Sequence, residues 1–600
     1  MRPPSSDRPW PQRLATVLRV VVVLACVWWI VPAAGARPVS APLAGGIVTL
    51  CDETHLRAAL ASGGTVTFAC SGTITLTEQI TITPDTTIDG RGQAVTISGN
   101  DTVRVLYVNN GVTLRLLSLS IVDGRDDGGQ SAGYGGGVVN RGTLVISYST
   151  VSGNDTGGRH GSVGAGILNN GVLVVDHSTL ADNSATGDFD YGDGGDGGGI
   201  YNSGTLTVSN SLFDNNYAGG ERGHGGGIWN SGTLSVSHSI FSGNGAGAGD
   251  HDSSSGGAIS SGRNCIVSHS TFSGNSVSGS MAYGGAIGGN CAVISSTFSN
   301  NHASHLGSGF YRGYGGAIAG GSTVSHSTFA GNIAQEGGAI FNVRTVTHST
   351  FAGNYADWDG GAISGINSVT SSTFTSNRAG YTHSGGFGGA IYVGGGALAV
   401  SNSTFNGNHA SWADGSGGLG GGIYVGGGGT LTVTHSTFAG NIAEYDGGGI
   451  FTRGALTLQN TIIAHSVMAT NCFNDFGQVI DGGGNLSYPD ATCPGINADP
   501  RLGPLQDNGG PTHTMAPGPG SAAIDAAVDA VCAAPPVNGL DQRGIMRPQG
   551  PHCDIGAVEQ DQPWTPTPTP TVTPTPTITP TPTSTPTPQG RFFPFVPRGR

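Results

Sequence analysis

Apolar and hydroxyl side chains alternate along many short segments of this 600-residue chain. Residues 206–209 (Leu-Thr-Val-Ser) and residues 431–434 (Leu-Thr-Val-Thr) are two examples. Alternation over about four residues, with β-branched side chains, is typical of a strand that buries one face. Glycine interrupts every such segment and strong helix formers are nearly absent. The pattern therefore predicts many short strands and almost no helix.

One unit recurs between residues 130 and 465. It begins with Gly-Gly-(Gly/Ala)-Ile, continues with Gly-Thr-Leu-Thr-Val and ends with His-Ser-Thr-Phe-x-Gly-Asn. The closing asparagines, from Asn154 to Asn441, lie 22 to 33 residues apart. Such a period signals a solenoid, in which stacked equivalent strands bury continuous apolar ladders. We expect an all-β fold: a right-handed parallel β-helix solenoid of roughly fifteen coils with N- and C-terminal caps.

The two ends of the chain differ from the repeats. Arginines, a 12-residue apolar run (residues 20–31) and Ala34-Gly35-Ala36 indicate a cleaved export signal; an uncleaved membrane anchor and a lipoprotein signal ending at Cys26 are alternatives. A Thr-Pro segment favours an extended polyproline stalk. The residues after it are a sorting tag or a frayed terminus. The expected organisation is a signal peptide (1–36), an N-terminal cap and first coils (37–129), the repeat β-helix (130–465), a C-terminal cap (466–560), the stalk (561–590) and a short tail (591–600).

The N-terminal cap is expected to contain a short helix within residues 52–60. Leu56, Ala59 and Leu60 would lie on one face of that helix, which is the face that could close the first coil.

The cysteines test the register of the coils. Cys265 and Cys291 each precede the phenylalanine of their unit by seven residues. They should therefore occupy the same rung of consecutive coils, about 5 Å apart, which is within the range that a disulfide needs. Loss of Cys26 with the signal leaves an even number, which suits an oxidising compartment. The expected local pairs, whose connectivity the sequence leaves open, are Cys51/Cys70, Cys472/Cys493 and Cys532/Cys553.

Charge and composition exclude several classes of protein. The net charge is −14, and all 24 basic residues are arginine. A chain without lysine has neither a Walker-type phosphate loop nor a lysine nucleophile. An acidic chain also argues against a nucleic-acid partner, which would require a basic face. Charged residues are 10% of the chain, so charge-driven disorder is not expected.

The segment between each closing asparagine and the next glycine pair varies most in length. Insertions at one corner of a solenoid mark one face, often the binding face. Acidic residues outnumber arginines there, and aromatic side chains concentrate there too. Such rings suit stacking on sugars or docking on protein, whereas loop rings that simply tuck onto the coils are the alternative. The predicted ligand face comprises Tyr217, Tyr283, Tyr311, Tyr314, Tyr355, Trp358, Tyr381, Trp412 and Tyr445.

Four carboxylates cluster in one of these segments. Oxygen-rich loops suit calcium, although Asp-Gly pairs also simply favour turns. A calcium site is therefore a candidate, and no other cofactor is expected; its ligands would be Asp188, Asp190, Asp193 and Asp196. No nucleophile–base pair stands out, so we assign no catalytic residues.

Two resemblances to known families follow from these motifs. Residues 256–259 (Gly-Gly-Ala-Ile) with residues 272–275 (Phe-Ser-Gly-Asn) resemble the repeats of the polymorphic outer-membrane protein family, which are surface-displayed adhesin passengers. Asp507 to Thr512, Gly520 to Asp525, Asp541 to Gly544 and Cys553 to Ala557 resemble the choice-of-anchor Q domain. That resemblance implies attachment at a surface and no catalytic activity.

The function we expect is adhesion or surface recognition by an exported, cell-surface protein, through multivalent contacts along a rod. The alternatives are a secreted polysaccharide lyase or hydrolase on the same scaffold and a structural surface protein without a ligand. An enzyme is the less favoured of these. The expected partner is a cell-surface or extracellular glycan or protein. Membrane contact would come only through the export signal or anchoring, and the chain is expected to be a monomer.

Overall fold

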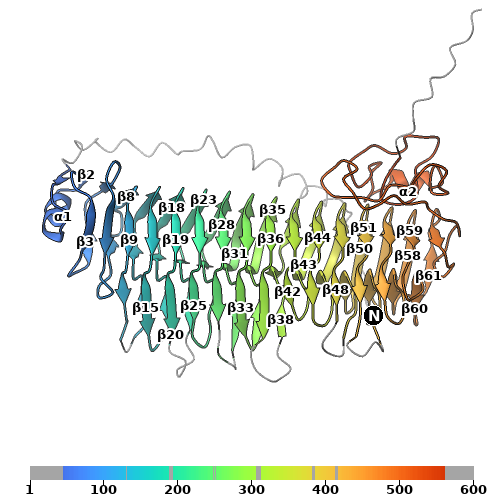
Figure 1. Ribbon diagram of the computed structural model, residues 1–600, viewed down its shortest axis with the longest axis horizontal. Coiled ribbons are helices and arrows are strands. Elements are labelled where there is room, and N and C mark those ends of the chain that lie inside the picture. The colour runs from blue at the N-terminus through green and yellow to red at the C-terminus, as the bar shows by residue number, and fades with distance from the viewer. Residues whose placement is uncertain are drawn as a thin grey trace, which may run out of the picture. The chain divides into compact units, whose positions relative to one another are not determined.

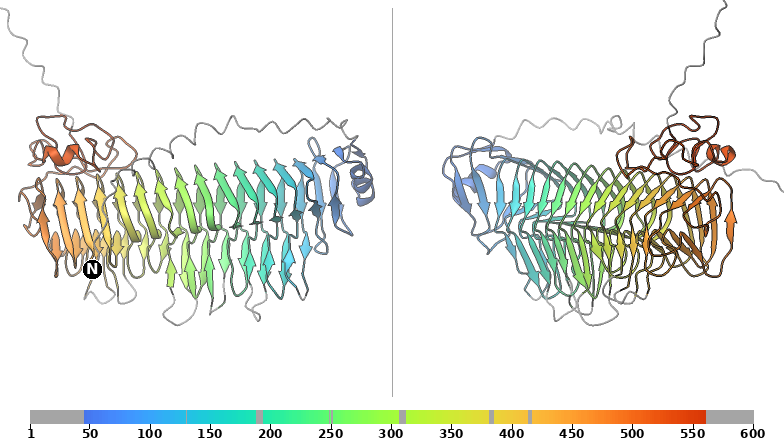
Figure 2. Two further views of the ribbon diagram at one scale, coloured as in Figure 1. Left: turned by 180° about the vertical axis from the view of Figure 1, so that it is seen from behind. Right: turned by 45° about the vertical axis from the view of Figure 1, so that its right-hand side comes forward.

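The computed structural model describes residues 45–560, apart from residues 130, 188–193, 248, 250–251, 306–311, 381–384 and 413–416. Its strands stack in parallel, coil on coil, in rows that run from the first coils to the last (Figures 1 and 2). The rows form sheets of 28, 16 and 12 strands and two sheets of three. This confirms the right-handed parallel β-helix. The expected signal peptide, stalk and tail lie outside the described residues.

A typical coil has four strands. In one coil these are β26 (Ile228–Asn230), β27 (Thr233–Ser237), β28 (Ile240–Ser242) and β29 (Gly245–Gly247). The first two belong to the 28-stranded sheet, the third to the 16-stranded sheet and the fourth to the 12-stranded sheet. The sheet that contains β28 has 16 strands, and this number agrees with the roughly fifteen coils expected.

Identical residues stack along the inside of the rod. The phenylalanines of successive units, from Phe213 to Phe438, are fully buried, and their rings lie 4.5 to 4.8 Å apart and nearly parallel. Burying each ring contributes about 2–3 kcal/mol. The closing asparagines form a second ladder: the Asn275 amide donates to Asn301 Oδ1 at 2.9 Å, and the next coils repeat the bond. Each buried amide is thus satisfied by its neighbour.

One turn residue before each phenylalanine strand is histidine in some coils and asparagine or serine in others. The backbone conformation of the turn explains this choice of residue. Its backbone is left-handed, with φ of 49° at His238 and 48° at His269. Asparagine and histidine are enriched in this region. The two histidine rings stack with their centroids 4.9 Å apart.

The N-terminal helix forms as expected. Helix α1 spans Glu53–Leu60, and Asp52 caps it by accepting a hydrogen bond from the backbone N–H of His55 at 2.9 Å. Leu56, Ala59 and Leu60 are its buried residues, so the predicted face closes the first coil.

The stacked strands continue past residue 465, where the repeat was expected to end. β60 (Cys472–Asn474), β61 (Val479–Asp481) and β62 (Leu486–Tyr488) add one more coil. This coil lacks the Gly-Gly-x-Ile motif, because Cys472 stands where earlier coils have isoleucine.

The remaining segment, 489–560, contains α2 (Asp529–Ala533) and packs on the turns of the later coils. The Gln542 side chain accepts a hydrogen bond from Thr404 at 2.7 Å, and Asn460 and Val528 exchange two bonds. Within the described part of the chain, no helix is long and apolar enough to cross a membrane.

The eight cysteines of the described residues form the four expected pairs: Cys51–Cys70, Cys265–Cys291, Cys472–Cys493 and Cys532–Cys553. Cys265 and Cys291 lie opposite each other in β31 (Ile259–Ser268) and β35 (Ile287–Ile294), with Cα atoms 4.5 Å apart. The register read from the repeat is therefore correct.

Candidate functional site

One outward-facing row of residues runs along the first strand of each coil. In β26, Ile228 and Asn230 are buried and Trp229 between them points outward, because side chains alternate along a strand. The parallel register places the equivalent residues one above the other. We call this row the floor; it consists of Tyr107, Val139, Leu168, Tyr201, Trp229, Ser260, Gly288, Ala319, Phe341, Ser364, Tyr392, Tyr424, Phe451 and Phe473.

A second row lies beside the floor, at the residue before the first glycine of each motif; that glycine begins a glycine pair in every coil of the row except at Gly164-Ala165. The first glycine of each pair donates its N–H to the carbonyl oxygen of the next coil's residue in this row. We call this row the rim; it consists of Tyr134, Val163, Asp196, His224, Ser255, Tyr283, Tyr314, Glu336, Asp359, Phe387, Leu419 and Asp446.

The glycine pair brings rim and floor together. Gly225 has a φ of 64°, and a Cβ at Gly226 would lie 2.2 Å from the carbonyl oxygen of Gly245. The first position therefore needs left-handed backbone, and the second leaves no room for a side chain. This sharp, close turn places the rim residue beside the outward residue of the following strand.

Three hollows adjoin along the N-terminal half of this face. Their volumes are about 580, 330 and 540 Å³. The first two share His224, and the last two share Tyr134 and Val163. Together they form one groove, which we call the open groove, bounded by Arg104 at one end and Gly289 at the other.

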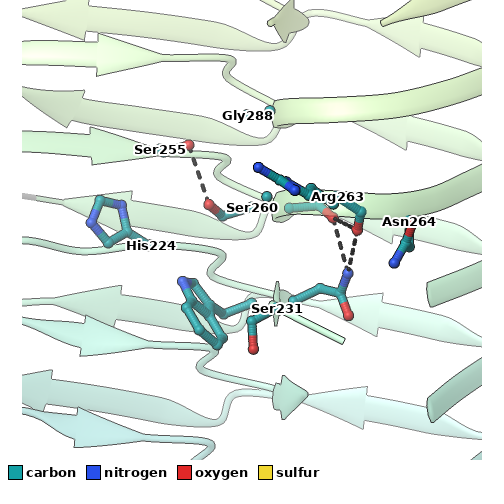
Figure 3. A pocket seen from close by; sticks show the side chains of 12 residues that line it. His224, Ser231, Ser255, Ser260, Arg263, Asn264 and Gly288 are labelled. Carbon is teal, nitrogen blue, oxygen red and sulfur yellow. Dashed lines mark hydrogen bonds between the residues drawn. The ribbon is translucent and has the colours of Figure 1, made fainter. Parts of the chain in front are cut away.

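The largest hollow occurs where the floor loses its large side chains. Trp229 is followed in the next two coils by Ser260 and Gly288, which place no large side chain beside the indole ring (Ser260 and Gly288 are labelled in Figure 3). A side chain at Gly288 would be strained, because a Cβ there would lie 2.8 Å from the backbone nitrogen of Gly256 and 2.9 Å from the carbonyl oxygen of Tyr283. Ser260 donates to Ser255 Oγ at 3.2 Å, which joins floor and rim.

Polar groups surround this hollow. Asn230 donates to Ser261 Oγ at 3.0 Å and to the Arg263 carbonyl oxygen at 3.3 Å. Nδ1 of His224 is buried and has no hydrogen-bond partner among the described residues, and burial lowers the pKa of this imidazole. The hollow thus combines one exposed aromatic face with hydroxyl, amide, imidazole and guanidinium groups.

Arginines dominate the charged groups along the open groove. Arg104 pairs with Asp126, and Arg222 pairs with Asp252 at 3.1 Å. The guanidinium of Arg141 lies 5.9 Å from the Tyr107 ring centroid. Arg141 and Arg263 form no ion pair with a carboxylate of the described residues. The lining arginines are Arg104, Arg141, Arg222 and Arg263.

Asp196 is the one carboxyl among the described residues that line the three hollows. Burial raises its pKa from 3.8 to about 7. Desolvation favours the uncharged acid, so this carboxyl contributes little negative charge below neutral pH.

The C-terminal half of the face is closed by its own aromatic side chains. Tyr392, Tyr424, Phe451 and Phe473 stack in consecutive coils, with centroids 5.2 to 5.5 Å apart. Phe387 of the rim lies over Tyr424 at 4.8 Å. Burial raises the pKa of Tyr392 to about 12. We call these four floor residues the closed stripe.

The structure separates the predicted ligand-face residues. Tyr283 and Tyr314 belong to the rim and stack at 5.1 Å, and Tyr314 meets Phe341 of the floor at 4.6 Å. Trp358 lies under the Arg312 guanidinium at 3.9 Å.

Other predicted face residues lie away from the floor. Tyr217 and Tyr355 stand in the 12-stranded sheet, and Tyr445 is exposed after β56 (Ile442–Ala443). Trp412 lies 6.3 Å from Phe387. Tyr311 and Tyr381 lie outside the described residues.

The calcium candidate is only partly described. Asp188, Asp190 and Asp193 lie outside the described residues, and Asp196 stands in β21 (Gly195–Asp196) facing the open groove. In the part of the chain that the structure describes, no three histidine, cysteine or carboxylate side chains gather as metal ligands would. The calcium site stays a prediction.

The floor residues were missed in the sequence, although a signal for them exists. An aromatic residue follows the isoleucine of the glycine motif at Tyr201, Trp229, Tyr392, Tyr424 and Phe451. Read alone, each seems part of an apolar strand. Only the stacking of coils turns them into one outward row.

Comparison with known proteins supports the repeat. Residues 371–394 and 435–453 match the Chlamydia polymorphic membrane protein repeat. The chain carries repeats of this type. Both segments contain the phenylalanine-to-asparagine spacing and the following glycine pair, which are the motifs that predicted the resemblance. The resemblance of residues 466–560 to a choice-of-anchor domain stays a prediction.

No curated protein matches the chain. Among solved structures, the crystal structure of pectate lyase Pel9A aligns over 84% of this chain and 90% of that chain, with 12% identity and a TM-score of 0.15. A TM-score this low supports no argument, so the fold rests on the strand register described above.

Proposed function

We propose that this protein is exported to the cell surface, where it recognises an extracellular glycan or protein through the open groove. The repeats of the polymorphic membrane protein type support a surface location, as does the pairing of the eight described cysteines, which suits an oxidising compartment.

One observation carries the proposal: partly exposed aromatic rings line a continuous groove beside convergent polar groups. Tyr107, Tyr201 and Trp229 are each partly exposed, and each belongs to a different coil. Rings that are half-buried present a rigid apolar face with little loss of side-chain entropy, which suits recognition. Repetition along the rod allows several weak contacts to add together.

A polysaccharide lyase or hydrolase is the second candidate, favoured by Asp196. A carboxyl with a pKa of about 7 beside a groove suits general acid catalysis near neutral pH. Glycoside hydrolysis usually requires a second carboxylate, and Asp196 is alone among the described carboxyls that line the hollows. Binding is therefore the better-supported function.

The test uses the full chain on arrays of polysaccharides and extracellular matrix proteins, with a parallel assay for new reducing or unsaturated ends. We expect retention without product, and loss of retention in the Tyr201→Ala/Trp229→Ala variant. The matched control is Tyr148→Ala, which removes an exposed ring stacked on His177 at a turn outside the groove. Product formation would establish the enzyme instead, and no retention on any surface would reject recognition.

A further inference from the structure

The charge of the open groove differs from that of the whole chain. The chain has 24 arginines and 38 acidic residues, and its net charge is −14. The described residues that line the three hollows include four arginines and one carboxyl, Asp196. A local excess of guanidinium groups on an acidic protein is a site where an anion is attracted and the remaining surface repels it.

Two of the arginines are available for a ligand. Arg141 and Arg263 are free of ion pairs with described carboxylates, and Arg263 is exposed at the edge of the largest hollow. Arg141 comes directly after Asn140 and Arg263 lies two residues after Ser261, and Asn140 and Ser261 stand four rungs apart in one ladder of stacked strands. At ~4.8 Å per rung, the backbone positions that carry the two cations are about 19 Å apart along the groove. An extended ligand could therefore reach both.

The groups between these cations suit sugar rings. Tyr201 and Trp229 stack on each other with centroids 4.3 Å apart, so each ring has only its outer face to offer. Tyr201 lines the hollow that includes Leu168, and Trp229 lines the hollow that includes Ser260. Ser231, Ser260 and Asn264 line the same hollow as Trp229 and supply hydroxyl and amide groups that can bond to sugar hydroxyls (Figure 3). A ligand with apolar ring faces and hydroxyl edges uses both kinds of contact.

The charge density of the groove favours a sparsely charged polymer. Two unpaired arginines over about four rungs match a chain with separated single charges better than a polyphosphate or a polysulfate. A guanidinium also binds a planar carboxylate through two parallel hydrogen bonds. Carboxylates on the sugar units of a linear chain meet both conditions.

We propose that the open groove binds a linear acidic polysaccharide, whose uronic-acid carboxylates pair with Arg141 and Arg263 while its sugar rings stack on Tyr201 and Trp229. This inference rests on the proposed recognition function and names the class of ligand. Burial, which raises the pKa of Asp196 to about 7, supports it, because this carboxyl is mostly uncharged below neutral pH and an ionised carboxylate there would repel the polymer.

The experiment measures binding of the full chain to immobilised polygalacturonate, with dextran, dextran sulfate and oligothymidylate as parallel ligands. The test variant is Arg141→Gln/Arg263→Gln. The matched control is Arg115→Gln/Arg344→Gln, which removes the same charge from two exposed arginines outside the three hollows. Thermal unfolding checks that both variants fold like the parent.

We expect polygalacturonate to bind in a salt-dependent manner, with at least ~tenfold weaker binding in the test variant and no change in the control. Binding that survives in the test variant, or that falls equally in the control, would overturn the assignment to the groove. Equal or tighter binding of dextran sulfate or oligothymidylate would overturn the carboxylate assignment.

Failure of the ligand class can be told apart from failure of the function. Retention on dextran or on a matrix protein, without binding to polygalacturonate, rejects the acidic polysaccharide but leaves surface recognition standing. Retention on none of these surfaces rejects both.

Discussion

The open groove and the closed stripe occupy the same row of the same sheet, yet they present opposite surfaces. In the closed stripe, aromatic residues in consecutive coils cover one another, so Tyr424 and Phe451 are buried although they point outward. In the open groove, Trp229 is followed by Ser260 and Gly288, and its ring has no aromatic neighbour on that side. A row of outward aromatic residues therefore leaves a ring face uncovered only where the row is interrupted.

Charge separates the two regions in the same way. Arg141 and Arg453 each follow a floor strand, and their guanidinium groups lie at similar distances from floor rings: 5.9 Å from the Tyr107 centroid and 6.0 Å from the Phe451 centroid. Arg453 is neutralised by Asp475 at 3.3 Å. Arg141 has no such carboxylate among the described residues. Among the described residues, the guanidinium charge beside the floor is therefore unpaired in the open groove and paired with a carboxylate in the closed stripe.

The largest expected effect concerns the disulfide that joins the two coils of the interrupted floor. Cys265→Ser/Cys291→Ser should lower the free energy of unfolding by about 2–4 kcal/mol, because the unfolded chain gains freedom. Hydrogen exchange should accelerate in β31 and β35, and affinity for polygalacturonate should fall. Cys472→Ser/Cys493→Ser should cost similar stability and leave the affinity intact. If both variants lose affinity equally, the disulfide does not act through the groove.

Removing one ring from each region tests whether the regions differ in function. Trp229→Ala should weaken polygalacturonate binding at least ~tenfold, as expected for an aromatic anchor of an interface. Phe451→Ala should lower the free energy of unfolding by about 3 kcal/mol through a cavity, with unchanged affinity. Calorimetric titration and denaturant unfolding measure the two quantities. The reverse pattern would place the binding surface on the closed stripe.

A large side chain in the interrupted part of the floor should make the open groove more like the closed stripe. Ser260→Tyr adds a ring next to Trp229 and fills the largest hollow, so affinity should fall about fivefold while the unfolding temperature stays within a few degrees. Binding that improves would mean that ligand rings stack on a continuous row rather than enter the hollow.

The smallest effect is a pH dependence that only the open groove should show. The pKa of Asp196 is about 7, above the ordinary 3.8, so this carboxyl ionises as pH rises from 6 to 8 and repels an anionic polymer. Affinity should fall about two- to threefold across this range, and Asp196→Asn should remove the dependence. His224, whose pKa burial lowers, and Tyr201, whose pKa burial raises, stay neutral across this range. Tyr134, His160 and Arg222 line the same hollow as Asp196.

The raised pKa of Asp196 also predicts how the stability of the protein depends on pH. A raised pKa in the folded state means that stability is lost as pH rises through the range between 3.8 and about 7, because the unfolded chain ionises first. Asp196→Asn should therefore gain in unfolding temperature relative to the parent between pH 5 and pH 8. A His224→Gln variant should behave differently, because burial lowers the pKa of His224: it should lose the rise in stability with pH up to 6.5 that this imidazole causes, and keep the fall that Asp196 causes.

Much of the fold could be predicted because the repeat places one residue type at one position in every coil. Spacing from Phe272 and Phe298 was enough to place Cys265 opposite Cys291. The end of the solenoid was harder, because its last coil replaces the glycine motif and its strands can be recognised only by their pairing with β57 (Ile450–Thr452), β58 (Ala455–Gln459) and β59 (Ile462–Ala464).

The candidate site was predicted less well than the fold. Aromatic residues in the variable segments attracted attention because they stand out among glycine and serine, and Tyr283 and Tyr314 do reach the rim. Tyr201 and Trp229 did not stand out, because in sequence they continue an apolar strand. Their exposure depends on which side chain lies above them in the next coil.

The sequence by itself determined the elements, the period of the coils, the inward ladders and the cysteine pairs, because each depends on short spacings that repeat. The tertiary structure alone decided which outward residues are covered. Val139 and Leu168, Ser260 and Gly288, and Tyr424 and Phe451 occupy one row, and their neighbours come from segments about 22 to 33 residues away. A groove therefore arises from differences between coils, which no single repeat contains.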